Sequence, residues 1–317
     1  MKTRRTFQIS IAAVLVAGAL FALTPPSTAA SEGERIKVRI GYPTALHGEI
    51  AKVLGKTDIG NKHGLDVQTT FFQYGPPQIE ALVSKTLDVS FTSLVPTASY
   101  LAKQPGAVTV IAGLGTAAHG LVVPGDSPIK ALSDFKGKTI AVAFGTDSQA
   151  DLLAALKDAG LVPGAVKLVN VPPNEQPAAL EQKLADGVVL RQPQLYKFIQ
   201  KGAREIRRWP HHLWVIARSD YLAANPGVRQ RLVDAIREAA VYVADNPRQA
   251  ATWFAEDLRV PAELIEKIAA ENPLFGKARP PEQLSVLVTP ELKAFSARRA
   301  QEIVEFGLPK ARPDFVY

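Results

Sequence analysis

Short apolar runs alternate with helical patterns from residue 36 onward, and this alternation restricts the possible folds more than any other feature of the sequence. The runs are rich in β-branched residues and predict strands. The predicted strands of this first section are residues 36–41, 65–72, 88–91 and 108–114. Such β-α-β alternation indicates an α/β protein with a mainly parallel sheet covered by helices.

The alternation begins again at residue 139. Further strands are predicted at residues 139–143, 166–171, 188–190 and 213–218. After Tyr221 the pattern is helical only. No low-complexity linker separates the two α/β sections, so we expect two short crossings to connect them. Two α/β halves that face each other can enclose a small molecule beyond the carboxyl ends of their strands, whereas one larger doubly wound domain with added helices is the alternative.

The first thirty residues have the composition of an export signal. Three cations precede a mostly apolar run at residues 9–23, and small residues follow at 27–30. The run is shorter than the roughly 20 residues that span a bilayer. We therefore predict a signal peptide at residues 1–30 and a periplasmic protein, with a retained anchor as the alternative. The Arg4-Arg5 pair leaves both the Sec and the twin-arginine export routes open.

Removal of this segment changes the charge of the chain. The whole sequence has a net charge of +7, but without the three N-terminal cations 34 basic and 30 acidic residues remain, a net charge of +4. So mild a charge does not indicate binding to nucleic acid. Hydrophobic residues make up 47% and charged residues 21% of the chain, which excludes a disordered chain and a multi-span membrane protein.

Several chemistries are excluded by missing residues. The chain has no cysteine, so disulfides, thiolate metal sites, iron–sulfur clusters and cysteine nucleophiles are absent. Residues 113–118 imitate a dinucleotide-binding turn, but the segment that follows is extended and not helical. His211 and His212 are adjacent before a strand, where successive side chains point apart, so they do not predict a shared metal. We expect no cofactor, no metal and no catalytic residue.

Residues 82–96 are similar to a stretch typical of the nitrate/sulfonate/taurine family of periplasmic solute-binding proteins, which serve ABC importers. The resemblance continues through residues 120–124, 129–142, 145–148 and 169–173. It implies a two-lobed periplasmic binding protein-like (type II) fold, with two doubly wound, mainly parallel sheets, a hinge and a helical C-terminal tail.

The resemblance also implies how the chain is divided and what it does. Residues 36–118 and 215–317 would form a discontinuous first lobe and residues 119–214 the second, with hinge crossings at 119–123 and 213–218. The protein would be a monomer that captures a sulfonate-, taurine- or nitrate-like solute and delivers it to the permease. An exported ligand sensor and an enzyme of the same fold, such as a cofactor-biosynthesis lyase, are the alternatives; the lyases are usually not exported.

The resemblance places ligand groups in loops at the ends of strands. Thr92 and Ser93 follow a strand and open a helix, where hydroxyl and free N–H groups can donate to an oxyanion. Ser93 as a simple helix cap is the alternative. Gly145, Thr146 and Ser148 repeat the arrangement in the second lobe. Asp147 weakens the case for an anion there, because its carboxylate would occupy that helix start.

A third loop carries Arg191 and Gln192, where the family often has a large residue followed by an acid. The guanidinium could hold a sulfonate, carboxylate or phosphate through two hydrogen bonds, and a surface arginine paired with an acid is the alternative. Tyr42 and His47 follow the first strand and could line the cleft with an aromatic surface and a polar group. An ordinary structural histidine is the alternative for His47.

Overall fold

The computed structural model describes residues 35–274 and 276–317, so the expected signal peptide at residues 1–30 lies outside the described residues. The α/β alternation of the first section is confirmed. Its elements are β1 (Ile36–Tyr42), α1 (Gly48–Lys56), α2 (Ile59–Lys62), β2 (Leu65–Phe71), α3 (Gly75–Val83), β3 (Val89–Thr92), α4 (Leu94–Lys103) and β4 (Val108–Val123). In this section β1 pairs in parallel with both β2 and β3.

The second section also follows the predicted alternation. It contains β5 (Thr139–Val142), α5 (Asp147–Asp158), β6 (Lys167–Asn170), α6 (Gln176–Glu181), β7 (Gly187–Arg191), α7 (Gln194–Gln200) and β8 (Arg204–Arg218). The rest of the chain is helical, as expected, with α8 (Ser219–Ala224), α9 (Val228–Asp245), α10 (Pro247–Leu258), α11 (Ala262–Ala270) and α12 (Pro290–Glu305). None of the helices in the described ranges has the length and apolar character needed to cross a membrane.

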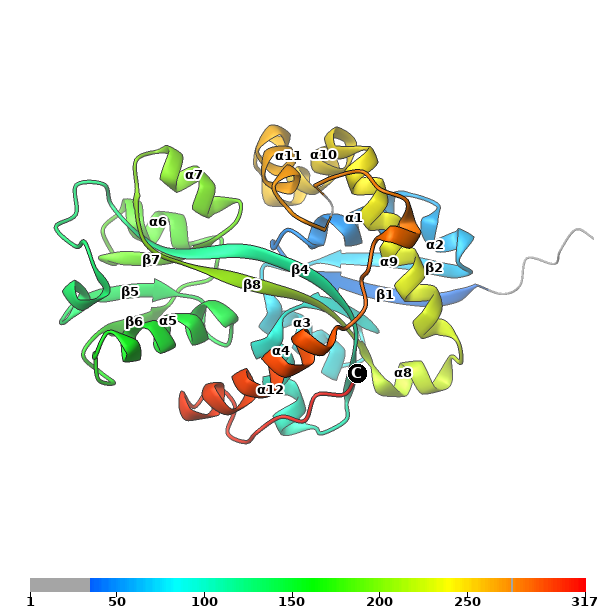
Figure 1. Ribbon diagram of the computed structural model, residues 1–317, viewed down its shortest axis with the longest axis horizontal. Helices are drawn as coiled ribbons and strands as arrows, with labels where there is room; N and C mark the ends of the chain where they lie inside the picture. Colours follow the sequence, from blue (N-terminus) through cyan, green and yellow to red (C-terminus); the bar gives the residue numbers. More distant parts are fainter. Residues whose placement is uncertain (1–34, 275) are drawn as a thin grey trace, which may run out of the picture. The chain divides into compact units, whose positions relative to one another are not determined.

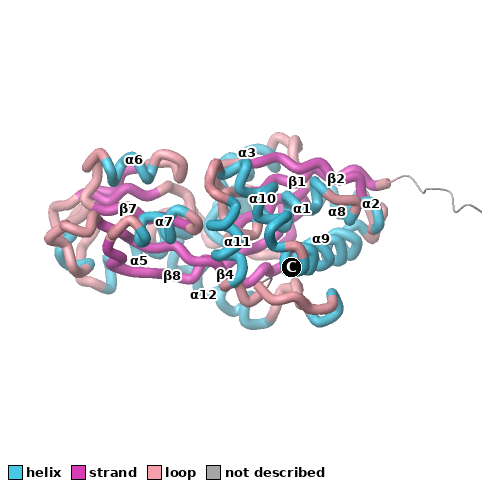
Figure 2. The backbone as a smooth tube through the Cα atoms, turned by 90° about the horizontal axis from the view of Figure 1, so that it is seen from above, coloured by secondary structure: helices cyan, strands magenta, loops and turns pink. Residues whose placement is uncertain are grey.

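The described strands form one sheet and not the two that we expected. The order is β2-β1-β3-β8-β4-β7-β5-β6. The sheet is continuous because β4 and β8 are long antiparallel strands that pair from Val108↔Arg218 to Val123↔Arg204. In Figures 1 and 2 these two strands run between the groups of elements at the two ends of the sheet. The second of these strands, β8, begins well before the predicted residue 213, because α7 ends at Gln200.

The long strands are irregular near their middle. The register between β4 and β8 shifts between Gly113 and Thr116, and Gly115 between them has a φ of 72°. Glycine adopts this left-handed backbone without the steric penalty of a side chain. A local shift of this kind interrupts the ladder of hydrogen bonds while both strands continue.

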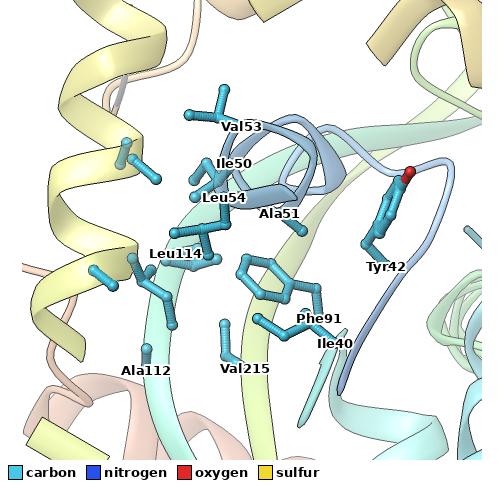
Figure 3. Close-up of a cluster of buried hydrophobic side chains, with 14 of the residues drawn as sticks. Ile40, Tyr42, Ile50, Ala51, Val53, Leu54, Phe91, Ala112, Leu114 and Val215 are labelled. Carbon is cyan, nitrogen blue, oxygen red and sulfur yellow. The ribbon is translucent and has the colours of Figure 1, made fainter. Parts of the chain in front are cut away.

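Separate apolar cores lie at the two ends of the sheet. One core packs α1 and α9 on β1, β3 and β8, and Figure 3 shows Ile40, Phe91 and Val215 beneath α1. Another contains Phe135 and Ile140 together with residues of α5. Burial of large apolar side chains stabilises each end independently. The division at residues 118/119 and 214/215 stays a prediction.

Candidate functional site

The starts of α4 and α5 meet through one carboxylate. Ser93 precedes α4, and its Oγ donates a hydrogen bond to Oδ2 of Asp147, the first residue of α5. The backbone N–H of Val95 donates to the same oxygen at 3.4 Å. The carboxylate of Asp147 therefore occupies the start of α4, whereas we expected it at the start of its own helix. Burial raises the pKa of this carboxyl, while the hydrogen bond from Ser93 and the charge of Arg191 oppose that change.

Arg191 ends β7 and reaches toward α5. Its Nε donates to Oγ of Ser148 at 3.1 Å, so the structure brings these two predicted residues together. Burial lowers the pKa of the guanidinium, and the charges of Asp147 and Asp151 raise it. Arg191 is half-buried, and the acidic residues near it are Asp147 and Asp151 of α5.

His47 is fully buried just before α1. Its ring lies 5.9 Å from the ring of Phe91, measured between centroids. The pKa of His47 is lowered to about 3, mainly by burial, which an interaction with the backbone of Thr92 opposes and to which the charge of Arg191 adds. His47 is therefore a neutral imidazole at ordinary pH.

Buried polar atoms from four elements lack hydrogen-bond partners within the part of the chain that the structure describes. Among them are both ring nitrogens of His47, Oγ1 of Thr92, Nη2 of Arg191 and Nε2 of His211, and these five atoms are here called the open polar groups. The charge of Arg191 lowers the pKa of both His47 and His211, which indicates that these groups lie near one another. A buried polar atom without a partner costs about 1–3 kcal/mol, so such a group marks a place where a ligand atom would be stabilised.

Other predicted residues are bound within the chain. The hydroxyl of Tyr42 donates to Oδ2 of Asp257 at 2.7 Å, and Lys52 donates to the other oxygen of that carboxylate at 2.8 Å. Thr146 Oγ1 donates to the carbonyl of Ala143 at 2.7 Å.

Two further predicted residues use their polar groups in local turns. The backbone N–H of Gly145 donates to Oε1 of Gln149 at 2.8 Å. Oε1 of Gln192 accepts a hydrogen bond from the backbone N–H of Tyr196 at 3.1 Å. These bonds hold the loops in place and leave fewer donors for a ligand.

A cavity of about 340 Å³ lies beside Arg191 and Gln192. Its volume is within the range of small-molecule sites. Phe71 supplies an aromatic wall, and several amide side chains surround it. The lining residues are Thr44, Phe71, Gln73, Pro173, Asn174, Gln176, Arg191, Gln192, Pro193, Gln194, Asp257, Leu258 and Arg259.

The sequence did not predict that His119 and His211 belong to this site. Nε2 of His119 lies 2.8 Å from Oδ2 of Asp151, and Nε2 of His211 lies 4.0 Å from Oδ2 of Asp147. The two rings are 5.4 Å apart between centroids. They meet because Ala117 pairs with His211 and His119 pairs with Trp209, so both histidines lie on one face of the β4–β8 ladder.

Asp151 has a second partner, Arg299 of α12, whose Nη2 lies 2.6 Å from Oδ1. The carboxylate of Asp151 therefore lies between a histidine of the sheet and an arginine of the C-terminal helix. Across the described ranges, no group of three or more histidine, aspartate or glutamate side chains is arranged to hold a metal ion.

The sequence is similar to a protein-family model and to known binding proteins. A family model described as NMT1/THI5 like matches residues 61–250, more than half of the chain. A provisionally assigned binding protein of Brucella abortus (strain 2308) is 28% identical over 301 residues, 91% of each chain. The taurine-binding periplasmic protein of Escherichia coli (strain K12) is 27% identical over 228 residues, 69% of this chain and 70% of that protein.

The fold is also similar to that of a solved structure. The periplasmic aliphatic sulphonate binding protein SsuA from Escherichia coli superposes with a TM-score of 0.72 at 23% sequence identity. The match covers 88% of this chain and 95% of that one. The described residues thus have the fold of a periplasmic binding protein.

Proposed function

The chain belongs to the NMT1/THI5-like family, and from this premise we propose that it binds a small oxyanion-bearing solute outside the cytoplasm and delivers it to the membrane subunits of an ABC importer. The relative that binds taurine and the fold shared with a sulphonate binding protein support a sulfonate or taurine-like ligand. Nitrate is included because of the sequence resemblance described above. The relatives named above are binding proteins, and we assign the chain no reaction.

The open polar groups are the observation that carries this proposal. Nη2 of Arg191 can donate to an oxyanion, and Nε of the same side chain is already oriented by Ser148. Oγ1 of Thr92 and the ring nitrogens of His47 are further buried hydrogen-bonding atoms of the site, and they come from another part of the chain. Charge-assisted hydrogen bonds to a guanidinium are about twice as strong as neutral ones, so an anion gains more here than a neutral solute does.

The side chains that would hold the solute come from two sections of the chain. Thr92 belongs to residues 36–118, and Ser148 and Arg191 belong to residues 119–214. We propose that these sections are two lobes, the first completed by residues 215–317, and that they close on the solute about β4 and β8. Contacts formed only in the closed state would then stabilise it and present it to the permease.

Isothermal titration calorimetry of residues 31–317 tests this function. The panel consists of ethanesulfonate, taurine, nitrate and acetate, with glycerol and choline as neutral and cationic controls. We expect one of the oxyanions to bind with a stoichiometry of one, and neither control to bind. Binding of glycerol or choline in place of the oxyanions would exclude the proposed ligand class.

A further inference from the structure

The charged side chains around the site balance one another. Arg191 and Arg299 supply two positive charges, and Asp147 and Asp151 supply two negative charges. Glu302 also contacts Arg299, but its side chain is 36% exposed, about twice as much as that of Asp151. These four side chains therefore have no net positive charge to offer an anion.

An anionic solute would leave this site with one uncompensated negative charge. In a site shielded from water such a charge raises the free energy of the complex, because little water is present to solvate or screen it. A guanidinium that already interacts with Asp147 and Asp151 compensates it only in part. A second positive charge must accompany the solute or form when it binds.

His211 is placed to supply that charge. It is 2% exposed, its Nε2 is one of the open polar groups, and this atom lies 4.0 Å from Oδ2 of Asp147. His119 lies beside Asp151 instead, and the negative charge of Asp151 is already compensated by Arg299.

Burial and the charge of Arg191 keep His211 neutral before the solute arrives. The titratable and charged groups that face it are Arg191 on β7, His119 on β4, His47 before α1, and the neighbouring His212, with Asp147 of α5 as the opposing charge. Burial, followed by the charge of Arg191, lowers the pKa of His211 well below its usual range. An anion bound to Arg191 offsets the repulsion from that arginine and attracts a proton to His211.

We propose that one proton enters the site together with the anionic solute and is held by His211, so that the solute is bound with no change in the net charge of the site. This inference rests on the proposed function and adds to it the proton linkage of the ligand. Between the pKa of His211 in the free protein and its higher pKa in the complex, the association constant then falls tenfold for each pH unit.

Calorimetry in two buffers measures the proton directly. The same four oxyanions are titrated at one pH in Tris and in bis-Tris, whose heats of ionisation differ. Neither buffer has an anionic form, whereas sulfonate and other oxyanion buffers are avoided because they resemble the solutes. For the oxyanion that binds, we expect the difference in heat to correspond to an uptake of about one proton per solute. Binding without proton uptake overturns the inference and leaves the proposed function intact.

Nuclear magnetic resonance of the free protein provides a test that requires no bound solute. The chain has five histidines, and the signals of His211 are assigned with the variant His211→Gln. We expect the imidazole of His211 to be neutral at pH 7 in the free protein. A charged imidazole at that pH overturns the inference, whether or not a solute of the panel binds. Failure of the whole panel to bind would overturn the proposed function.

Variants decide where the proton is held. His211→Gln should abolish proton uptake, and the matched control His63→Gln should retain it, because Nε2 of His63 contacts Glu238 at 2.8 Å and lies outside the open polar groups. Uptake that persists in His211→Gln overturns the assignment to His211. Asp147→Asn, which removes one negative charge from the site, should reduce the uptake to well below one proton.

Discussion

At the scale of single residues, Arg191 is the side chain on which the proposed ligand site depends most. Arg191→Ala removes the donor Nη2 together with the hydrogen bond to Ser148. We expect the dissociation constant of the oxyanion that binds to increase at least about tenfold, equivalent to 1.4 kcal/mol. Calorimetry measures this change. The control is Arg229→Ala, on the exposed side of α9, and equal affinities for the two variants would remove the guanidinium from the site.

Glu49 predicts a pH dependence of stability. It is fully buried in the first turn of α1, and burial raises the pKa of its carboxyl to about 8 from 4.5. An unfolded chain releases this proton above pH 4.5, whereas the folded protein retains it until about pH 8. The free energy of unfolding therefore falls as the pH rises through this window.

Glu49→Gln should remove this dependence. We expect the variant to match the parent near pH 4.5 and to exceed its stability at pH 8 by on the order of 1 kcal/mol or more, in urea unfolding followed by circular dichroism. The exposed control Glu282→Gln should follow the parent at both values. Parallel stability curves for the parent and Glu49→Gln would show that Glu49 is not the titrating group.

The sequence predicted part of the site because the ends of parallel strands meet. Thr92, Ser93, Ser148 and Arg191 follow strands, and the structure brings Ser148 to Arg191 and Ser93 to the start of α5. It could not predict His211, because that residue reaches the site through its register with β4, a pairing between segments about a hundred residues apart. Such register depends on the whole sheet and leaves no local pattern in the sequence.

At the scale of elements, α12 ties the C-terminal part of the chain to α5. Arg299 contacts Asp151 at 2.6 Å, and Glu305 contacts Lys157 at 3.3 Å. The first pair is about one-sixth exposed and the second about half exposed or more. Removing one partner of a largely buried pair costs more than removing an exposed one, because the remaining charge keeps its desolvation penalty.

Variants of these two contacts should therefore differ in stability. We expect Arg299→Ala to lower the free energy of unfolding by about 1–3 kcal/mol, since it leaves Asp151 without its guanidinium partner. Glu305→Gln, which breaks the exposed pair, should change it by less than about 1 kcal/mol. Urea unfolding of both variants measures the difference. Similar values for the two would mean that burial of the Asp151 contact does not contribute to its strength.

The sequence predicted the type of most elements but not the length of β4 and β8. Residues 114–118 of β4 contain glycine and small side chains, which in the sequence are typical of a loop. Here β8 lies alongside as an antiparallel partner strand, with Thr116 opposite His212 and Ala118 opposite Pro210. Strand formation at these positions thus depends on a partner strand and not on the local side chains.

At the scale of the whole molecule, the absence of cysteine permits a direct measurement of closure. Spin labels can be placed at Val162→Cys and Arg229→Cys, two exposed positions that belong to different proposed lobes. We expect the distance distribution between them to shift or narrow when the bound oxyanion is added. The control pair Val162→Cys and Leu184→Cys, both within residues 119–214, should not respond. An unchanged distribution for the first pair would argue against closure.

The bond between Asp147 and the start of α4 has a consequence for selectivity. Because this carboxylate belongs to the chain, it competes for the N–H group of Val95 and the hydroxyl of Ser93 at a high effective concentration. Any external anion that takes this position must first displace it. If the proposed solute uses these donors, ions that bind weakly, such as chloride, would be held back by the tethered carboxylate more than a tightly bound oxyanion would.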